Sequence, residues 1–193
     1  MVAPPRLHRY TYRDYVAVEM TSPTTKHEFL DGEIYAMAGG TEDHSALAAE
    51  VLGVLLLAAR DKPCRAHTSD LRIYVESPGL ATFPDVTVIC GPLIQHGPSP
   101  VSTALNPAVL VEVTSESSEH YDTVDKLGFY KTIPTLREYV IVSHRERRIT
   151  VHARDDRGGW TSRTAITGGR IDVDSIGAML VVDEIYAKSS VAP

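Results

Sequence analysis

The sequence predicts an α/β fold in which a mixed β-sheet is flanked by helices. Strand-like segments outnumber helical ones, and helical segments lie between strands both early and late in the chain. The compact apolar run Ala108–Thr114 is typical of a strand at the buried centre of a sheet. With 193 residues and 43% hydrophobic content, the chain suits a single domain with a full core. We therefore expect one domain over residues 1–193, with its core at about residues 10–187.

A short helix and a hairpin are expected first. Thr11 is a good helix N-cap, and the helical pattern continues to about Met20. In the segment KHEFLDGEIYAM, two strand-like runs flank Asp31-Gly32, a dipeptide suited to the positive φ angles of a type I′ turn. This segment is therefore predicted to be a β-hairpin.

The main helix is predicted to begin at Thr41 and to end at Arg60. Glu42 and Asp43 in its first turn complement the positive end of the helix dipole, and apolar residues then recur at helical spacing. The later elements are mostly strands. We expect strands at residues 65–67, 71–75, 85–89, 108–114, 138–142, 147–153 and 160–164, a surface loop at 91–106, a helix at 121–131 and a short terminal helix at 181–186.

Charge, hydropathy and cysteine content narrow the class of protein. The net charge of −6 argues against a protein that coats nucleic acid, although it does not exclude an enzyme that contacts nucleic acid locally with the help of cations. No apolar segment approaches the ~20 residues needed to cross a membrane, and the opening residues do not resemble a secretory signal. Cys64 and Cys90 indicate neither a zinc site nor a disulfide framework. We expect two small buried thiols in a cytoplasmic protein.

Glu112 lies in the middle of the apolar run AVLVEVT. Alternation places Leu110, Glu112 and Thr114 on one face of this strand and the valines on the other. If both faces are covered, the carboxylate must be neutralised, paired or bound to a cation, because burying a charge is costly. The alternative is a salt bridge or an edge strand with Glu112 in water.

Asp85 opens another strand-like run, DVTVIC, directly after Pro84. Pro-Asp alone is a turn dipeptide, but two carboxylates at the ends of neighbouring strands offer the hard oxygen ligands that Mg²⁺ or Mn²⁺ prefer. Lys126 follows on the next predicted helix, four residues after Asp122. Its ammonium group either forms a surface ion pair with Asp122 or serves as a cation that orients water and stabilises developing negative charge.

Between about Tyr10 and Tyr186 the chain carries, in this order, the segments HEFLDGEIYAMAGG, SDLRIYV, PDVTVIC, LVEVTSESSEHYD, KLGFY and IPTLREYVIVS. In these segments and their order the sequence resembles the Uma-two family of restriction-endonuclease-like proteins in the PD-(D/E)XK nuclease superfamily. The resemblance implies a restriction-endonuclease-like core, with Asp85 at the PD position and Glu112 at the next acidic position. A homodimer is also expected from this resemblance and from exposed strand edges.

The chain departs from the superfamily pattern in two places. Thr114 stands where a lysine usually follows the acid, and in similar proteins the lysine is displaced onto the next helix, at a position that matches Lys126. Glu116 stands where similar sequences carry proline, and it adds an acid near the expected site.

Four further features have both a structural and a functional interpretation. Glu33 and His44 match positions typical of the family: Glu33 is either a turn residue or a third acid, and His44 is a capping side chain, a general base or a substrate contact. Asp70 is better explained as a turn residue. A basic cluster at residues 145–148 is expected at a hairpin tip, in solvent or against a phosphate backbone.

Together these features predict a Mg²⁺- or Mn²⁺-dependent hydrolase that cleaves phosphodiester bonds in DNA. Asp85 and Glu112 hold the metal ion, Lys126 assists catalysis, and Glu33 and His44 support the site. The alternative is a non-catalytic module on a nuclease-like scaffold that binds nucleic acid or protein, which the acidic balance and the missing lysine favour. Acid–base chemistry on another substrate ranks last.

Overall fold

The computed structural model describes residues 9–97 and 101–192, whose strands form two mixed sheets and one small antiparallel pair. The larger sheet has six strands in the order β11-β10-β9-β8-β6-β3, and the smaller has five in the order β2-β1-β5-β4-β7. The mixed sheet flanked by helices that the sequence predicted is confirmed. Its division into two sheets was not predicted.

The larger sheet is the centre of the fold. It comprises β3 (Cys64–Thr68), β6 (Val86–Cys90), β8 (Val109–Val113), β9 (Glu138–Val142), β10 (Arg148–Arg154) and β11 (Trp160–Ile166). Within this sheet β8 and β9 pair in parallel, and every residue of both is buried. The run around Glu112 is therefore a central strand, as predicted, because both of its faces are covered.

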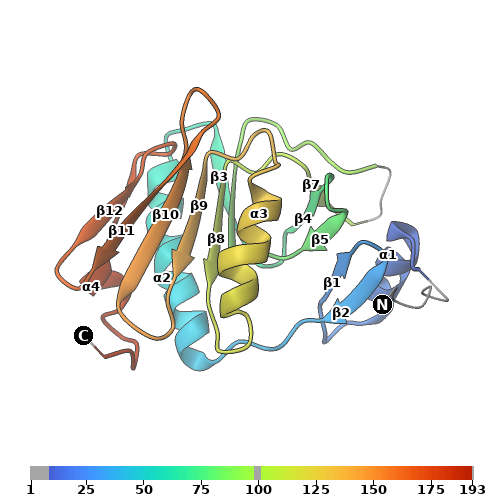
Figure 1. Ribbon diagram of the computed structural model, residues 1–193, viewed down its shortest axis with the longest axis horizontal. Helices are drawn as coiled ribbons and strands as arrows, with labels where there is room; N and C mark the ends of the chain where they lie inside the picture. Colours follow the sequence, from blue (N-terminus) through green and yellow to red (C-terminus); the bar gives the residue numbers. More distant parts are fainter. Residues whose placement is uncertain (1–8, 98–100, 193) are drawn as a thin grey trace, which may run out of the picture.

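Helices cover the two faces of this sheet (Figure 1). The long helix α2 (Glu42–Ala59) packs against the face that carries Val109, Val111 and Val113. The opposite face, with Leu110 and Glu112, lies against a helical segment that starts as a π-helix (Tyr121–Lys126) and continues as α3 (Leu127–Tyr130). The alternation predicted for β8 therefore places its valines in the part of the core beside α2 and Leu110 in the part beside α3.

The smaller sheet is built from strands of the N-terminal part of the chain and strands from its middle part. It contains β1 (His27–Leu30), β2 (Glu33–Ala36), β4 (Arg72–Val75), β5 (Leu80–Thr82) and β7 (Thr103–Ala104), and α1 (Tyr12–Thr21) packs on β1. Thr11 caps α1 through a complete capping box. The hairpin turn has φ angles of 46° at Asp31 and 88° at Gly32, which confirms a type I′ turn.

Several sequence predictions need correction. Residues 91–106 are not simply a loop, because β7 lies within them and pairs in parallel with β4; residues 98–100 lie outside the described part. Strands β5, β12 (Arg170–Val173) and β13 (Ala178–Val181) were not predicted, since they are short and weakly patterned. The terminal helix is confirmed as α4 (Val182–Ile185).

The two cysteines are also placed differently from the expectation. Cys64 and Cys90 are direct partners across the antiparallel strands β3 and β6 and form a disulfide. Strand pairing brings together two residues 26 positions apart, which spacing in the sequence does not reveal. Cysteine usage therefore no longer supports the expectation of a reducing compartment. In the described part of the chain, the helices are too short or too polar to cross a membrane.

Candidate active site

Asp85 and Glu112 are neighbours because of the register between β6 and β8. Val86 pairs with Val111 in antiparallel fashion, so Asp85, one residue before β6, faces Glu112. The backbone N–H of Val113 donates to Oδ2 of Asp85 over 2.8 Å, which fixes the carboxylate against the end of β8. The two acids that the sequence singled out therefore lie side by side at the edge of the central strands.

Lys126 reaches this pair from the helical segment on the same face. Its Nζ lies 3.0 Å from Oε1 of Glu112, 3.1 Å from Oε1 of Glu28 and 3.2 Å from Oδ1 of Asp122. The contact with Asp122 is an ion pair without a well-directed hydrogen bond. Lys126 is only 4% exposed, so it does not form the surface pair that spacing alone also allowed. One ammonium group is enclosed by three carboxylates.

Neutral hydroxyl groups complete this cluster. Tyr130 donates to Oε1 of Glu112 over 2.8 Å, and Thr82 donates to Oε1 of Glu28. Tyr130 lies four residues after Lys126, which itself lies four residues after Asp122, so all three point from the helical segment toward β8. The cluster is thus assembled from β1, β5, β8 and one helical stripe.

The buried charges of the cluster do not balance. Burial raises the pKa of Glu112 to about 8, against the opposing effect of Lys126, and burial likewise raises the pKa of Asp122. Burial by itself lowers the pKa of Lys126, but Glu112, Glu28 and Asp122 outweigh it and hold that pKa well above its usual value. Lys126 is therefore a permanent cation, and the surplus of negative charge must be neutralised by protons or by a further cation.

His44 lies on the other side of Asp85, in the first turn of α2. Its Nε2 is 3.3 Å from Oδ2 of Asp85, and this hydrogen bond raises the pKa of the imidazole despite its partial burial. Thr41, not His44, is the capping side chain, since its hydroxyl accepts the backbone N–H of His44. Gly40 allows the ring to sit here, because a Cβ on Gly40 would lie 2.6 Å from Nδ1 of His44.

These residues line one cavity of about 1000 Å³. The hydrogen bonds and ion pairs of the described residues engage Oδ2 of Asp85 and Oε1 of Glu112. The other oxygens, Oδ1 of Asp85 and Oε2 of Glu112, take no part in these contacts. Both residues border the cavity. Such an arrangement can present two carboxylate oxygens to a ligand.

The donor set restricts the kind of metal ion that would fit. Within residues 9–97 and 101–192, no three His, Cys, Asp or Glu side chains are grouped as ligands of one ion. A site based on two carboxylates does not suit zinc, which takes three or four protein ligands. It does suit Mg²⁺ or Mn²⁺, because these ions keep several waters and share phosphate oxygens with a substrate.

Glu33 is not at the position where a third acid was expected. It pairs with Leu30 across the hairpin, whereas Glu28, two residues earlier on β1, is the acid that contacts Lys126. Among the described residues that border the cavity, Glu28 is included and Glu33 is not. Sequence reasoning missed Glu28 because its role depends on how β1 packs against the helical segment. The only available signal was its acidic character at a buried strand position.

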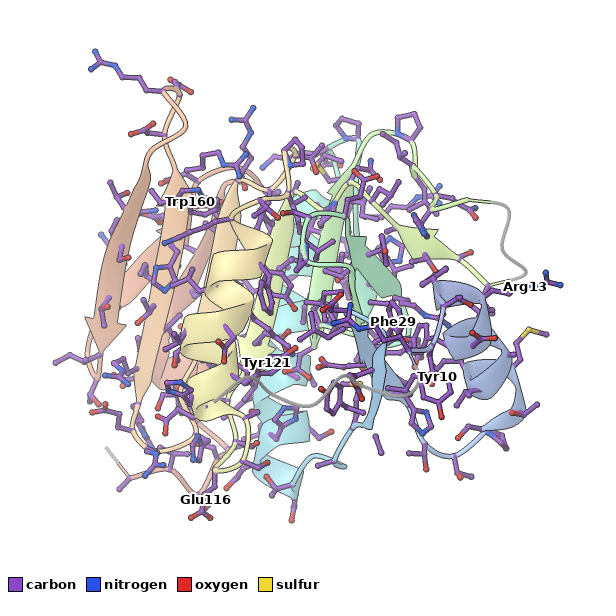
Figure 2. The ribbon with its side chains drawn as sticks, turned by 45° about the vertical axis from the view of Figure 1, so that its right-hand side comes forward. Tyr10, Arg13, Phe29, Glu116, Tyr121 and Trp160 are labelled. Carbon is purple, nitrogen blue, oxygen red and sulfur yellow. A yellow bond between two sulfur atoms is a disulfide. The ribbon has the colours of Figure 1, made fainter. Side chains whose placement is uncertain are left out.

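Two other predicted features lie away from the cluster. Glu116 is exposed and points outward from the lower end of the molecule (Figure 2). The basic residues at 145–148 lie in the turn between β9 and β10 and at the first position of β10, but Arg145 pairs with Glu119 over 2.6 Å and Arg148 with Glu146 over 3.1 Å. Neither feature contributes to the cavity.

Comparison with known proteins gives the family. Residues 12–176 match the family Uma2, described as "putative restriction endonuclease". The chain is 33% identical over 161 residues to the uncharacterized protein slr1290 of Synechocystis sp., covering 83% of each chain. It is 34% identical over 119 residues to the uncharacterized protein sll1609 of the same organism, covering 62% of this chain and 67% of that one.

A solved structure supports the same conclusion at the level of the fold. The crystal structure of a "putative nuclease belonging to DUF820" from Anabaena variabilis is similar with a TM-score of 0.68 and 15% identity, over 83% of this chain and 89% of that chain. At this identity the likeness concerns the fold alone. The family match and the relatives confirm the resemblance seen in the sequence: the chain belongs to the Uma2 family of restriction-endonuclease-like proteins.

Proposed function

We propose that this protein is a divalent-metal-dependent nuclease that hydrolyses phosphodiester bonds in DNA, with Asp85 and Glu112 as the metal ligands. The observation that carries the proposal is the pair of adjacent carboxylates at the edge of a cavity, within a buried cluster that holds more negative than positive charge. A divalent cation neutralises this surplus. Membership of the Uma2 family supports phosphodiester hydrolysis as the reaction.

Each residue has a distinct role in this proposal. Mg²⁺ or Mn²⁺ at Asp85 and Glu112 would activate water and neutralise charge on the phosphoryl group. Lys126 cannot act as a general base, because its raised pKa keeps it protonated. It holds Glu112 in place through its hydrogen bond and supplies positive charge near the reacting phosphate. His44 orients Asp85, and Glu28 replaces Glu33 as the supporting acid.

Calorimetric titration of Mn²⁺ tests this proposal before any substrate is known. We expect the wild-type protein to bind Mn²⁺ and the Glu112→Gln variant to lose binding, because the amide provides a weaker and uncharged ligand. Glu146→Gln is the control and should bind like the wild type, because Glu146 is an exposed acid that pairs with Arg148 and does not border the cavity. Equal binding by the wild type and Glu112→Gln would contradict the assignment.

A second prediction concerns the position of His44. Gly40→Ala is expected to lower turnover by about tenfold to a hundredfold, because the added methyl group displaces the imidazole from Asp85 and disturbs the pair of acids. Gly39→Ala is the matched control, since a Cβ there meets no atom within 4 Å. Steady-state kinetics of both variants provide the measurement. Similar activity of the two variants would show that the position of His44 does not matter for catalysis.

One observation favours a different function. Lys126 is enclosed by three carboxylates, and Glu112 already accepts two hydrogen bonds, so the cluster could serve as a structural ion-pair network. The protein would then be a binding module on a nuclease-like scaffold, and its binding of nucleic acid would not respond to divalent metal. The Mn²⁺ titration separates the two functions, because only the nuclease requires a metal ion at Glu112.

A further inference from the structure

The two acids border a cavity whose volume is that of a small-molecule pocket. Its volume of about 1000 Å³ lies at the upper end of the range for small-molecule pockets. Glu112 and Lys126, which border it, are each only 4% exposed. A phosphodiester bond must therefore enter the protein to reach them.

The walls of the cavity come from separate elements. Ala48, Ala49 and Leu52 of α2 form an apolar side, and residues 35–40, at the end of β2 and directly after it, form a second side. The serine-rich turn after β8 forms a third. Tyr121 lies toward the lower end of the pale yellow helical segment in Figure 2, with the centre of its ring 5.3 Å from Nζ of Lys126. Protein segments from several elements therefore border the two acids.

Tyr35 is an aromatic residue at the rim of this cavity. It is the direct partner of Glu28 across the hairpin, so the two side chains lie on the same face of the sheet. Glu28 in turn contacts Lys126 over 3.1 Å, which places Tyr35 beside the cluster of acids. Tyr35 remains 51% exposed, so packing in the core does not explain a large aromatic side chain here.

Few positive charges in the cavity are available to phosphate groups. Among the described residues that border it, the basic ones are Lys26, His44 and Lys126. Lys126 is surrounded by carboxylates, and Lys26 pairs with Asp70 over 2.8 Å. Proteins that hold a DNA duplex depend on many phosphate contacts. Base stacking must therefore supply a larger share of binding here than it does in those proteins.

We infer, on the basis of the proposed nuclease function, that the substrate is single-stranded DNA, and that a base next to the reacting phosphodiester stacks on Tyr35. Every base has a flat face, so stacking on a tyrosine needs no particular sequence. A base in a duplex is already stacked and paired, and it must leave the helix before it can enter such a cavity. An unpaired strand avoids this cost.

Cleavage of matched substrates by the full chain with Mn²⁺ tests the inference. The probes are a labelled single-stranded oligonucleotide and the same sequence as a duplex. We expect kcat/KM to be about tenfold or more higher for the single strand. Tyr35→Leu should raise KM for the single strand by about tenfold with little change in kcat. Tyr10→Leu is the control, since Tyr10 is also exposed, at 43%, but does not border the cavity.

The outcomes distinguish this inference from the proposal beneath it. Metal-dependent cleavage of the duplex at an equal or higher rate would overturn the inference and leave the nuclease function standing. An unchanged KM for Tyr35→Leu would overturn the stacking role in the same way. Absence of cleavage of both substrates would overturn the nuclease function and this inference with it.

Discussion

Replacing Asp85 by Asn is expected to reduce kcat for phosphodiester cleavage by about a thousandfold or more, and Glu112→Gln is expected to have the same effect. Each change removes one of the two negative charges proposed to hold Mg²⁺, while it preserves the shape of the side chain. The measurement is cleavage of an oligonucleotide at saturating Mn²⁺. A variant that cleaves as fast as the wild type would exclude the residue from the metal site.

These variants should remain folded, which makes a loss of activity interpretable. In Asp85→Asn the amide oxygen can still accept the N–H of Val113, and in Glu112→Gln it can still accept from Lys126 and Tyr130. Glu146→Gln is a suitable control, because Glu146 is an exposed acid that pairs with Arg148 and does not border the cavity. Its activity should equal that of the wild type.

The pH dependence of stability gives Glu112→Gln a second readout. Burial raises the pKa of Glu112 from 4.5 to about 8 in the folded protein. Between these values the folded state binds more protons than the unfolded state, so wild-type stability should fall as pH rises through this window. The Gln variant cannot titrate at this position, so its stability should fall less over the same window, and the raised pKa values of Asp122 and His44 account for the decrease that remains. Urea unfolding at pH 5 and pH 8, values chosen about the ends of this range, would detect the difference.

The second large effect is expected from Lys126→Met, which should lower the free energy of unfolding by about 3–5 kcal/mol at mildly alkaline pH, where Glu112 is ionised. Methionine fills a similar volume but leaves Glu28, Glu112 and Asp122 buried without their shared cation. Urea denaturation provides the measurement. Lys188→Met is the control: Lys188 is 83% exposed and lies 3.7 Å from Glu50, so its loss should cost less than about 0.5 kcal/mol.

The loss caused by Lys126→Met should depend on pH. The raised pKa of Lys126 means that its stabilising charge is present in the wild type throughout the acidic and neutral range and is lost only at alkaline pH. At acidic pH Glu112 is protonated, since its pKa is raised to about 8, and the missing cation then matters less. A loss of equal size under acidic and mildly alkaline conditions would show that packing, not charge, explains the effect.

Some parts of the site could be predicted because they follow from local pattern. Alternation along AVLVEVT places Glu112 on the face opposite the three valines, and the structure has this arrangement. The strand predicted after Pro84 places Asp85 directly before β6. Asp122, Lys126 and Tyr130 follow one another at a spacing of four residues in the sequence. Only the spacing of Asp122 and Lys126 was recognised there as a possible ion pair.

Other parts could not be predicted, because they depend on contacts between distant segments. Glu28 joins the cluster only when the smaller sheet packs beside the helical segment, and Glu33, although typical of the family, is two residue pairs too far along the hairpin. The disulfide between Cys64 and Cys90 likewise follows from the pairing of β3 with β6.

The sequence by itself determined the α/β class, the type I′ hairpin, the capped helices and the central strand that carries Glu112. These features depend on residue preferences and periodicities within about 20 neighbouring positions, and such local signals survive without knowledge of the fold. Only the tertiary structure decided that the strands divide into two sheets and that one lysine serves three carboxylates. It also formed the cavity beside Tyr35. Each of these depends on the register and packing of elements far apart in the chain, where a shift of one residue would turn a side chain to the opposite face.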